Sequence, residues 1–221
     1  MKHLLRTLLV LALVGPAALS AQTIVGSKHD LSVSGANGGF FTAAALGGQT
    51  CVYCHTPHLA QANTKGPLWN RNNSAAVYTM YTSSTIKEPM TAQPGAQSLS
   101  CLTCHDGTVA VWSTFNTVQG TATALQVNAG YTGGLVKATG LMGGVNKLGS
   151  DLTTSHPVGI DFNNALDAGL QPIASVNASA VKLFGIKVEC ASCHAVHDRT
   201  NVPFLRRNNL SSALCTTCHL K

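Results

Sequence analysis

Four short motifs of one kind constrain this chain more than any other feature. All eight cysteines of the 221-residue sequence fall into C-x-x-C pairs, and a histidine follows every pair at once. C-x-x-C-H is the attachment signature of c-type haem, in which the two thiols add to the vinyl groups and the histidine binds the iron. The sequence therefore predicts four covalently attached haems. Their attachment cysteines and proximal iron ligands are Cys51, Cys54 and His55; Cys101, Cys104 and His105; Cys190, Cys193 and His194; and Cys215, Cys218 and His219.

Three other uses of paired cysteines compete with this interpretation. A disulfide framework would suit an exported protein, but disulfides do not require a histidine after each pair. Structural zinc can be held by C-x-x-C pairs, but it does not call for the same histidine four times. A thioredoxin-like redox pair would account for one motif and leave three unexplained.

Residues 1–21 are predicted to form a cleaved export signal. Lys2 and Arg6 precede a short apolar run, and Gly15-Pro16 and several small residues follow it. The run is too short to cross a membrane, and no later stretch reaches the roughly 18 apolar residues that a span needs. We therefore expect an exported mature chain of residues 22–221, either extracellular or periplasmic, with no membrane span.

The histidines that remain match the number of vacant iron positions. His3 leaves with the signal, and four histidines then lie outside the motifs. Four haems need four sixth ligands, so the count predicts bis-histidine ligation at every iron. The alternative ligands are Met80, Met90 and Met142, any of which would raise the potential of its haem. The predicted distal ligands are His29, His58, His156 and His197.

Two of these histidines stand three residues after a motif histidine. His58 follows His55, and His197 follows His194, at a spacing that puts both rings on one side of a helical turn. Two such rings cannot approach one iron from opposite faces. We therefore expect each second histidine to reach a different haem and to hold two haems close together.

An internal repeat predicts a single domain built from two di-haem halves, about 22–107 and 150–221, with a cysteine-free segment between them. Each half also carries a P-x-x-x-R-N-N segment, at Pro67 and at Pro203. This segment either closes a turn or places Arg71, Arg206 or Arg207 against haem propionates.

The predicted fold class is a multihaem cytochrome c. Helical periodicity is weak, so we expect mostly irregular coil with short helices and a few β-strands, organised around four covalently bound haems. The β-like stretches are 108–115 and 181–188, and Gly-Gly pairs supply turn signals. With so little regular structure the chain has few side chains to form a core, and the four buried haem rings would take the place of much of it.

The charge balance does not point to a nucleic-acid partner. Without Lys2 and Arg6 the mature chain has 12 basic and 8 acidic residues, and the basic residues form no cluster. The negatively charged haem propionates would balance this excess of basic residues. Only 10% of the residues are charged, which gives little electrostatic protection against self-association.

The segments CLTCHDGTVA, SHPVGIDF, FGIKVECASCHAVH and LCTTCH resemble the doubled-CXXCH multihaem cytochromes. The size, the four motifs, the early SKHDLS and the CVYCHTPH opening resemble more specifically the OmcE-type extracellular tetrahaem cytochrome filaments. This resemblance implies bis-histidine haems, polymers that conduct electrons outside the cell, and one distal histidine donated across the subunit boundary. His29, upstream of every motif, is the candidate for the donated ligand; the alternative is ligation within its own chain.

Three functions follow from these features. The first is extracellular electron transfer by a self-associating filament that is not an enzyme and passes electrons to extracellular acceptors. The second is a discrete soluble electron shuttle, periplasmic or secreted, that docks on redox partner proteins. The third is a multihaem reductase, which would need an open iron position, and the histidine count leaves none.

Overall fold

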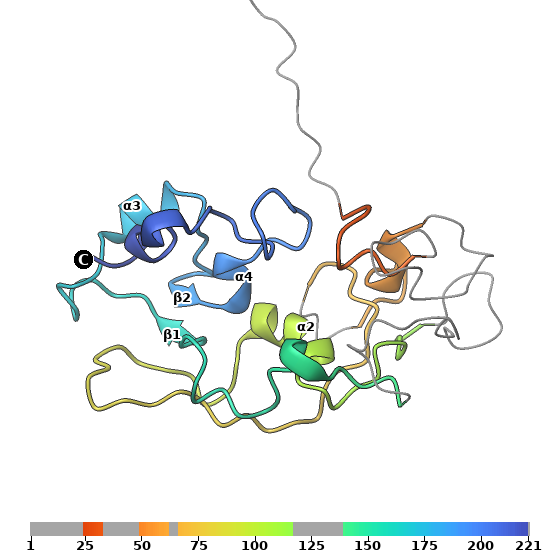
Figure 1. The fold of residues 1–221 in the computed structure, drawn as a ribbon. Coiled ribbons are helices and arrows are strands. Elements are labelled where there is room, and N and C mark those ends of the chain that lie inside the picture. The colour runs from red at the N-terminus through yellow and green to blue at the C-terminus, as the bar shows by residue number, and fades with distance from the viewer. Residues whose placement is uncertain (1–23, 33–48, 62–65, 117–138, 221) are drawn as a thin grey trace, which may run out of the picture.

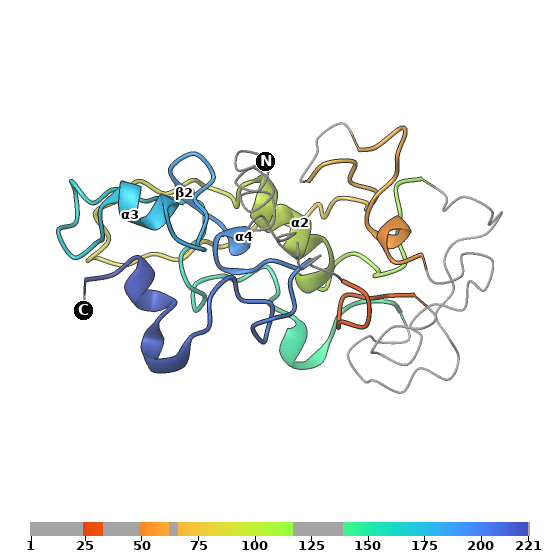
Figure 2. The same ribbon diagram turned by 90° about the horizontal axis from the view of Figure 1, so that it is seen from above.

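The structure is a computed structural model, and it describes residues 24–32, 49–61, 66–116 and 139–220. The predicted export signal lies outside these residues, as does part of the cysteine-free middle segment. The described part of the chain is elongated in both views (Figures 1 and 2). Its elements, in chain order, are η2 (Cys51–Tyr53), α2 (Ala96–His105), η3 (Gly144–Asn146), β1 (Ile160–Asp161), α3 (Ile173–Asn177), β2 (Lys187–Val188), α4 (Cys190–Cys193), η4 (Leu210–Ser212) and η5 (Cys215–Thr217).

Most of the described backbone is irregular, as the weak periodicity predicts. α2 is the longest helix, with ten residues, and one antiparallel sheet pairs β1 with β2. Of the two β-like stretches, 181–188 contributes β2. The stretch 108–115 forms only isolated bridges, Ala110 with Leu141 and Thr114 with Arg71. The prediction of coil with short helices and few strands is confirmed at this coarse level.

Local chemistry explains where the two central helices begin and end. α2 is followed by Gly107, whose φ of +73° is the left-handed conformation that commonly terminates a helix. α4 begins with a capping box, in which Glu189 accepts from the backbone of Ser192 while the Ser192 hydroxyl accepts from the backbone of Glu189. The two helices lie side by side in both views (Figures 1 and 2).

Two small apolar clusters form the described side-chain core. One contains Tyr78, Leu102 and Leu152, under α2. The other lies around the sheet and α3 and consists of Phe162, Leu170, Val176, Val181 and Val188. Each cluster is small, so side-chain burial alone gives this part of the chain a thin core.

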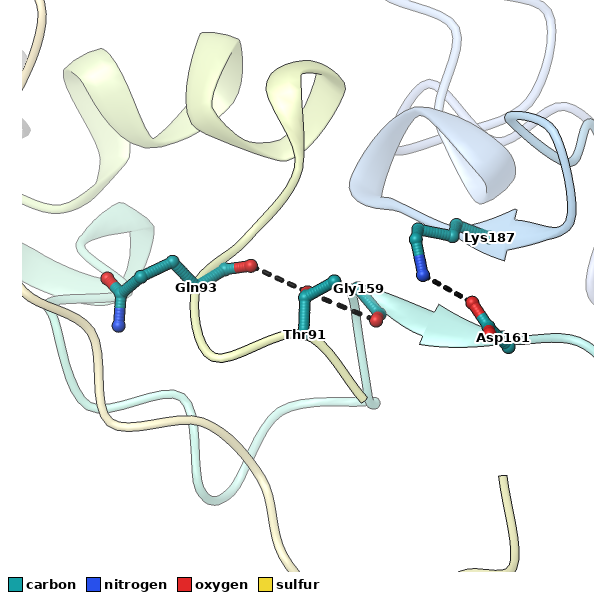
Figure 3. A network of polar contacts seen from close by, with 5 residues as sticks. All are labelled: Thr91, Gln93, Gly159, Asp161 and Lys187. Carbon is teal, nitrogen blue, oxygen red and sulfur yellow. Dashed lines mark hydrogen bonds and ion pairs between the residues drawn. The ribbon is translucent and has the colours of Figure 1, made fainter. Parts of the chain in front are cut away.

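A polar network joins the loop before α2 to the sheet (Figure 3). The Thr91 hydroxyl lies 2.6 Å from the Gln93 carbonyl and 3.1 Å from the Gly159 carbonyl, and Lys187 pairs with Asp161 across the two strands. The Thr91–Gly159 contact joins residues 68 positions apart, so it fixes the loop against the segment that precedes β1.

The two halves of the chain repeat one backbone pattern after their first motif. The N–H of Asn70 donates to the Cys54 carbonyl at 2.8 Å, and the N–H of Arg206 donates to the Cys193 carbonyl at 2.8 Å. Leu68 and Phe204, at the matching positions, both have positive φ, at 56° and 61°. The P-x-x-x-R-N-N segment thus closes a turn in each half, with Arg71 and Arg207 at equivalent positions.

No described helix is long and apolar enough to cross a membrane.

Candidate haem sites

Each C-x-x-C-H motif lies on one helical turn. The first begins with η2, the second ends α2, the third begins with α4 and the fourth begins with η5. In a helical turn, residues i, i+3 and i+4 share a face, so both thiols and the imidazole of a motif lie on the same side. That is the arrangement that covalent attachment of haem requires. In three motifs a hydrogen bond from the histidine backbone N–H to the carbonyl of the first cysteine closes the turn. These bonds are His55 to Cys51 at 2.9 Å, His194 to Cys190 at 3.1 Å and His219 to Cys215 at 3.0 Å.

The cysteine side chains are available for attachment. All eight are free of disulfides. Burial raises the pKa of Cys54 and of Cys218 to about 11, so both remain thiols at neutral pH. Among the described residues, no three His, Cys, Asp or Glu side chains converge as structural zinc would need.

Three motif histidines have a fixed tautomer. Nδ1 of His55 lies 2.8 Å from the Pro67 carbonyl, Nδ1 of His105 lies 2.8 Å from the Asn146 carbonyl, and Nδ1 of His194 lies 3.0 Å from the Pro203 carbonyl. A carbonyl can only accept, so Nδ1 carries the proton and Nε2 keeps its lone pair. Metal-binding histidines are commonly oriented in this way, and Nε2 is left to bind the iron.

His197 lies against a motif other than its own. The centre of its ring is 6.1 Å from the centre of the His55 ring. Its pKa is lowered, first by burial and then by His55, which favours the neutral, ligating form. The spacing argument placed His197 beside a different haem motif, and the structure agrees.

His29 also lies beside a motif of its own chain, as the alternative of ligation within the chain expects and donation across a subunit boundary does not. Its ring centre is 6.0 Å from that of His105. Burial, followed by the charges of His105, His194 and His197, lowers its pKa to about 4, so the ring is neutral at pH 7. Its position upstream of every motif suggested a ligand for another subunit. The turn at residues 24–32 instead folds the segment back onto the second motif.

Both ring separations match the geometry of two imidazoles on one metal ion. A ligating nitrogen lies about 2 Å from a transition metal, and the ring centre lies about 1 Å further, so two opposed rings have centres about 6 Å apart. The ring separations of 6.0 and 6.1 Å are compatible with each pair of imidazoles holding one iron.

Unpartnered buried polar atoms beside these pairs also fit a cofactor. Nδ1 of His29 and Nε1 of Trp69 are buried and have no hydrogen-bond partner among the described residues. Trp69 packs against His55, with ring centres 5.8 Å apart. Buried polar atoms are rarely left unpaired, because each one costs free energy. His29, His105, His55 and His197 would hold the haems, and the unpartnered atoms beside them are consistent with a polar group bound there, so the residues present fit the cofactor.

The other two predicted distal ligands are not brought to a second described motif. His58 and His156 are both exposed, and Nδ1 of His156 lies 3.0 Å from the Pro157 carbonyl. The expectation that His58 reaches another motif therefore stays a prediction. Beside the fourth motif lies an open pocket of about 420 Å³, lined by Ser211, Ser212, Cys215, Thr216 and His219. Its lining includes no second histidine.

Side-chain contacts link the first three motifs. Arg71 reaches the Tyr53 carbonyl of the first motif at 3.2 Å and Sγ of Cys104 in the second at 3.8 Å. The backbone N–H of Cys190, which opens the third motif, donates to the Ser98 hydroxyl of α2 at 2.9 Å. In the second half, burial and then the charges of Cys190 and of Cys215 in the fourth motif raise the pKa of Cys193. The four attachment points therefore follow one another from the first motif to the fourth along the molecule, as the two views also show (Figures 1 and 2).

Arg71 lies buried between the first two motifs. From the sequence it was expected either in a turn or against a haem propionate. One terminal nitrogen donates to the Tyr53 carbonyl at 3.2 Å, and the other contacts the carbonyls of Ala110 and Val111. Arg206 and Arg207 also contact protein atoms, with Nε of Arg206 on the Ala191 carbonyl and Nη1 of Arg207 on the Thr217 hydroxyl. The repeated R-N-N segment singles out Arg71 in the sequence, but the repeat does not predict that the side chain is buried.

Comparison with known proteins agrees with these features at a coarse level. Residues 185–221, which include the third and fourth motifs, match the family model of the doubled CXXCH motif. The matched pair indicates covalently bound c-type haem. It supports a multihaem c-type cytochrome that carries electrons. No curated protein matches the chain.

Proposed function

We propose that this chain is a tetrahaem c-type cytochrome in which electrons pass along four bis-histidine haems. The observation that carries the proposal is the pair of imidazole separations, 6.0 Å for His29 with His105 and 6.1 Å for His55 with His197. When bound, each haem iron takes up and releases one electron between its ferric and ferrous states. The chain itself fixes the spacing, the ligands and the surroundings of each iron.

The order of the motifs supports transfer along the molecule. Electron tunnelling falls steeply with distance, so a carrier must hold its redox centres almost in contact. Arg71 contacts both the first and the second motif, and Cys190 of the third motif donates to Ser98 on the helix that ends in the second. The segment that holds His194 and His197 would also link two haems. His194 would bind the iron of the third motif, and His197 would bind the iron at His55 of the first motif.

The two ends of this line are the most open, which favours end-to-end assembly. Cys51 in the first motif and Cys215 in the fourth are the exposed cysteines, whereas the cysteines of the central motifs are half-buried. His58, beside the first motif, is exposed. In a filament, His58 of one copy would ligate an iron of the next copy. His58 thereby takes the place of His29 as the candidate for the donated ligand.

Export before assembly would place such a filament outside the cell, where it delivers electrons to extracellular acceptors. The alternative function is a discrete soluble shuttle, for which the same open ends would serve as docking points for redox partner proteins. In either case we propose an electron carrier and not an enzyme, because four histidines for four sixth positions leave no iron position open to a substrate.

Mass spectrometry of the denatured holoprotein tests the number of haems. The proposal predicts a mass increase equal to four haems, and a smaller increase would contradict it. Negative-stain electron microscopy of the native extracellular fraction then separates the two forms of carrier. The filament predicts thin regular fibres, which His58→Ala abolishes while four haems remain attached. Monomers that stay dispersed at high concentration would replace the filament with the shuttle.

A further inference from the structure

Arg71 connects the first two haem motifs through its guanidinium group. The side chain is 1% exposed. Nη1 donates to the Tyr53 carbonyl within the first motif at 3.2 Å, and Nη2 lies 3.8 Å from Sγ of Cys104 in the second. Nη2 also donates to the carbonyl of Val111. A positive charge is therefore held at the edge shared by two attachment sites.

No carboxylate neutralises this charge within the described residues. The ion pairs found there are Lys87 with Asp167 and Lys187 with Asp161, both in other parts of the structure. The three buried carboxylates of the same half are engaged elsewhere, and one of them, Glu88, accepts from the backbone N–H of Lys87. Asp30 accepts from Gly26 and Ser32, and Asp106 accepts from Tyr78 and Thr108.

Burying a cation costs free energy, because water no longer solvates it. Carbonyl dipoles offset part of that cost at Arg71, but they leave its net charge in place. Water and salt screen a buried charge much less than an exposed one. Its field therefore acts on whatever lies at Cys54 and Cys104.

The second half of the chain provides an internal comparison. Arg207 occupies the position equivalent to Arg71, as the matching hydrogen bonds of Asn70 and Arg206 show. Its Nη1 lies 2.9 Å from the Thr217 hydroxyl, within the fourth motif, so its charge also lies beside an attachment site. Arg207 is exposed, however, and its charge is screened by solvent. The repeat thus carries the same cation buried in one half and exposed in the other.

We propose that Arg71 sets the redox potential of the first two haems, holding them more reducible than they would be without its buried charge. The inference rests on the proposed tetrahaem function. On reduction each ferric iron accepts one electron from an external donor, and the charge of its haem falls by one unit. A nearby positive charge stabilises that more negative state and raises the potential. Arg71 acts through its charge and does not ligate iron.

The test is a reductive titration of the holoprotein with dithionite, followed at the haem absorption bands. Mass spectrometry first establishes that the parent and each variant carry four haems, so a failure of the tetrahaem proposal is seen separately. For Arg71→Gln we expect the reduction equilibrium constant of at least one haem to fall tenfold or more, a shift of 59 mV to lower potential for a one-electron couple. Arg71→Lys keeps the charge and should stay within threefold of the parent.

Arg207→Gln is the matched control, and it should change no constant by more than threefold. The inference is overturned if Arg71→Gln titrates like the parent, if Arg207→Gln shifts as far, or if Arg71→Lys shifts as far as Arg71→Gln, which would make the role purely structural. Should Arg71→Gln fail to retain four haems, Arg71→Leu removes the charge without leaving a buried amide, and the same comparison applies.

Discussion

Removing the imidazole of His29 tests the ligand assignment at the second motif. His29 and His105 have ring centres 6.0 Å apart, the separation expected for two ligands of one iron, while His55 and His197 form a separate pair. His29→Ala should therefore leave one of the four irons without its sixth ligand. That iron becomes high-spin, so about a quarter of the low-spin signal should be lost, and the other three haems should be unchanged.

Electron paramagnetic resonance of the oxidised holoprotein measures this change directly. Phe204→Ala is the control, because the Phe204 ring packs 4.6 Å from the His29 ring and carries no ligand. It should preserve the full low-spin signal. Added imidazole should enter the space left in His29→Ala and restore the lost quarter. A His29→Ala protein in which all four irons stay low-spin would refute the assignment, as would a loss that imidazole cannot restore.

Two further predictions concern stability, each measured by chemical denaturation of the holoprotein. Leu152→Ala removes a side chain that is 3% exposed in the cluster under α2, and it should cost about 2–5 kcal/mol of the unfolding free energy. Leu210→Ala, at a position 77% exposed, should cost almost nothing. Gly159→Ala forces a left-handed backbone, at φ +72°, and puts a methyl group into the Thr91 hydroxyl, so it should cost more than the ~1–2 kcal/mol of the conformation alone. Gly144→Ala has the same sign of φ and open space, and should cost only that conformational part.

The motifs were readable from the sequence because their chemistry is local. C-x-x-C-H spans five residues, and one helical turn is enough to bring two thiols and an imidazole to one face. The three-residue spacing of His194 and His197 likewise ruled out a shared iron, and His197 indeed lies against His55. The coarse fold also followed from the weak periodicity, since a chain without amphipathic repeats forms few long helices or strands.

Long-range placement could not be read in the same way. The position of His29 depends on a turn that folds residues 24–32 onto the second motif and on Phe204, from the other half of the chain. The burial of Arg71 depends on carbonyls of Tyr53 and Val111, which lie 18 and 40 residues away. Neither contact leaves a periodic pattern. The stretch 108–115 has the composition of a strand, but it finds only isolated bridges because no neighbouring strand runs beside it in the described structure.

The most direct test of the account is a cryo-electron microscopy map of the native holoprotein at side-chain resolution. The account predicts porphyrin density at all four C-x-x-C-H motifs, with one iron between His29 and His105 and another between His55 and His197. A map with fewer than four porphyrins, or with either iron ligated by a different side chain, would contradict it.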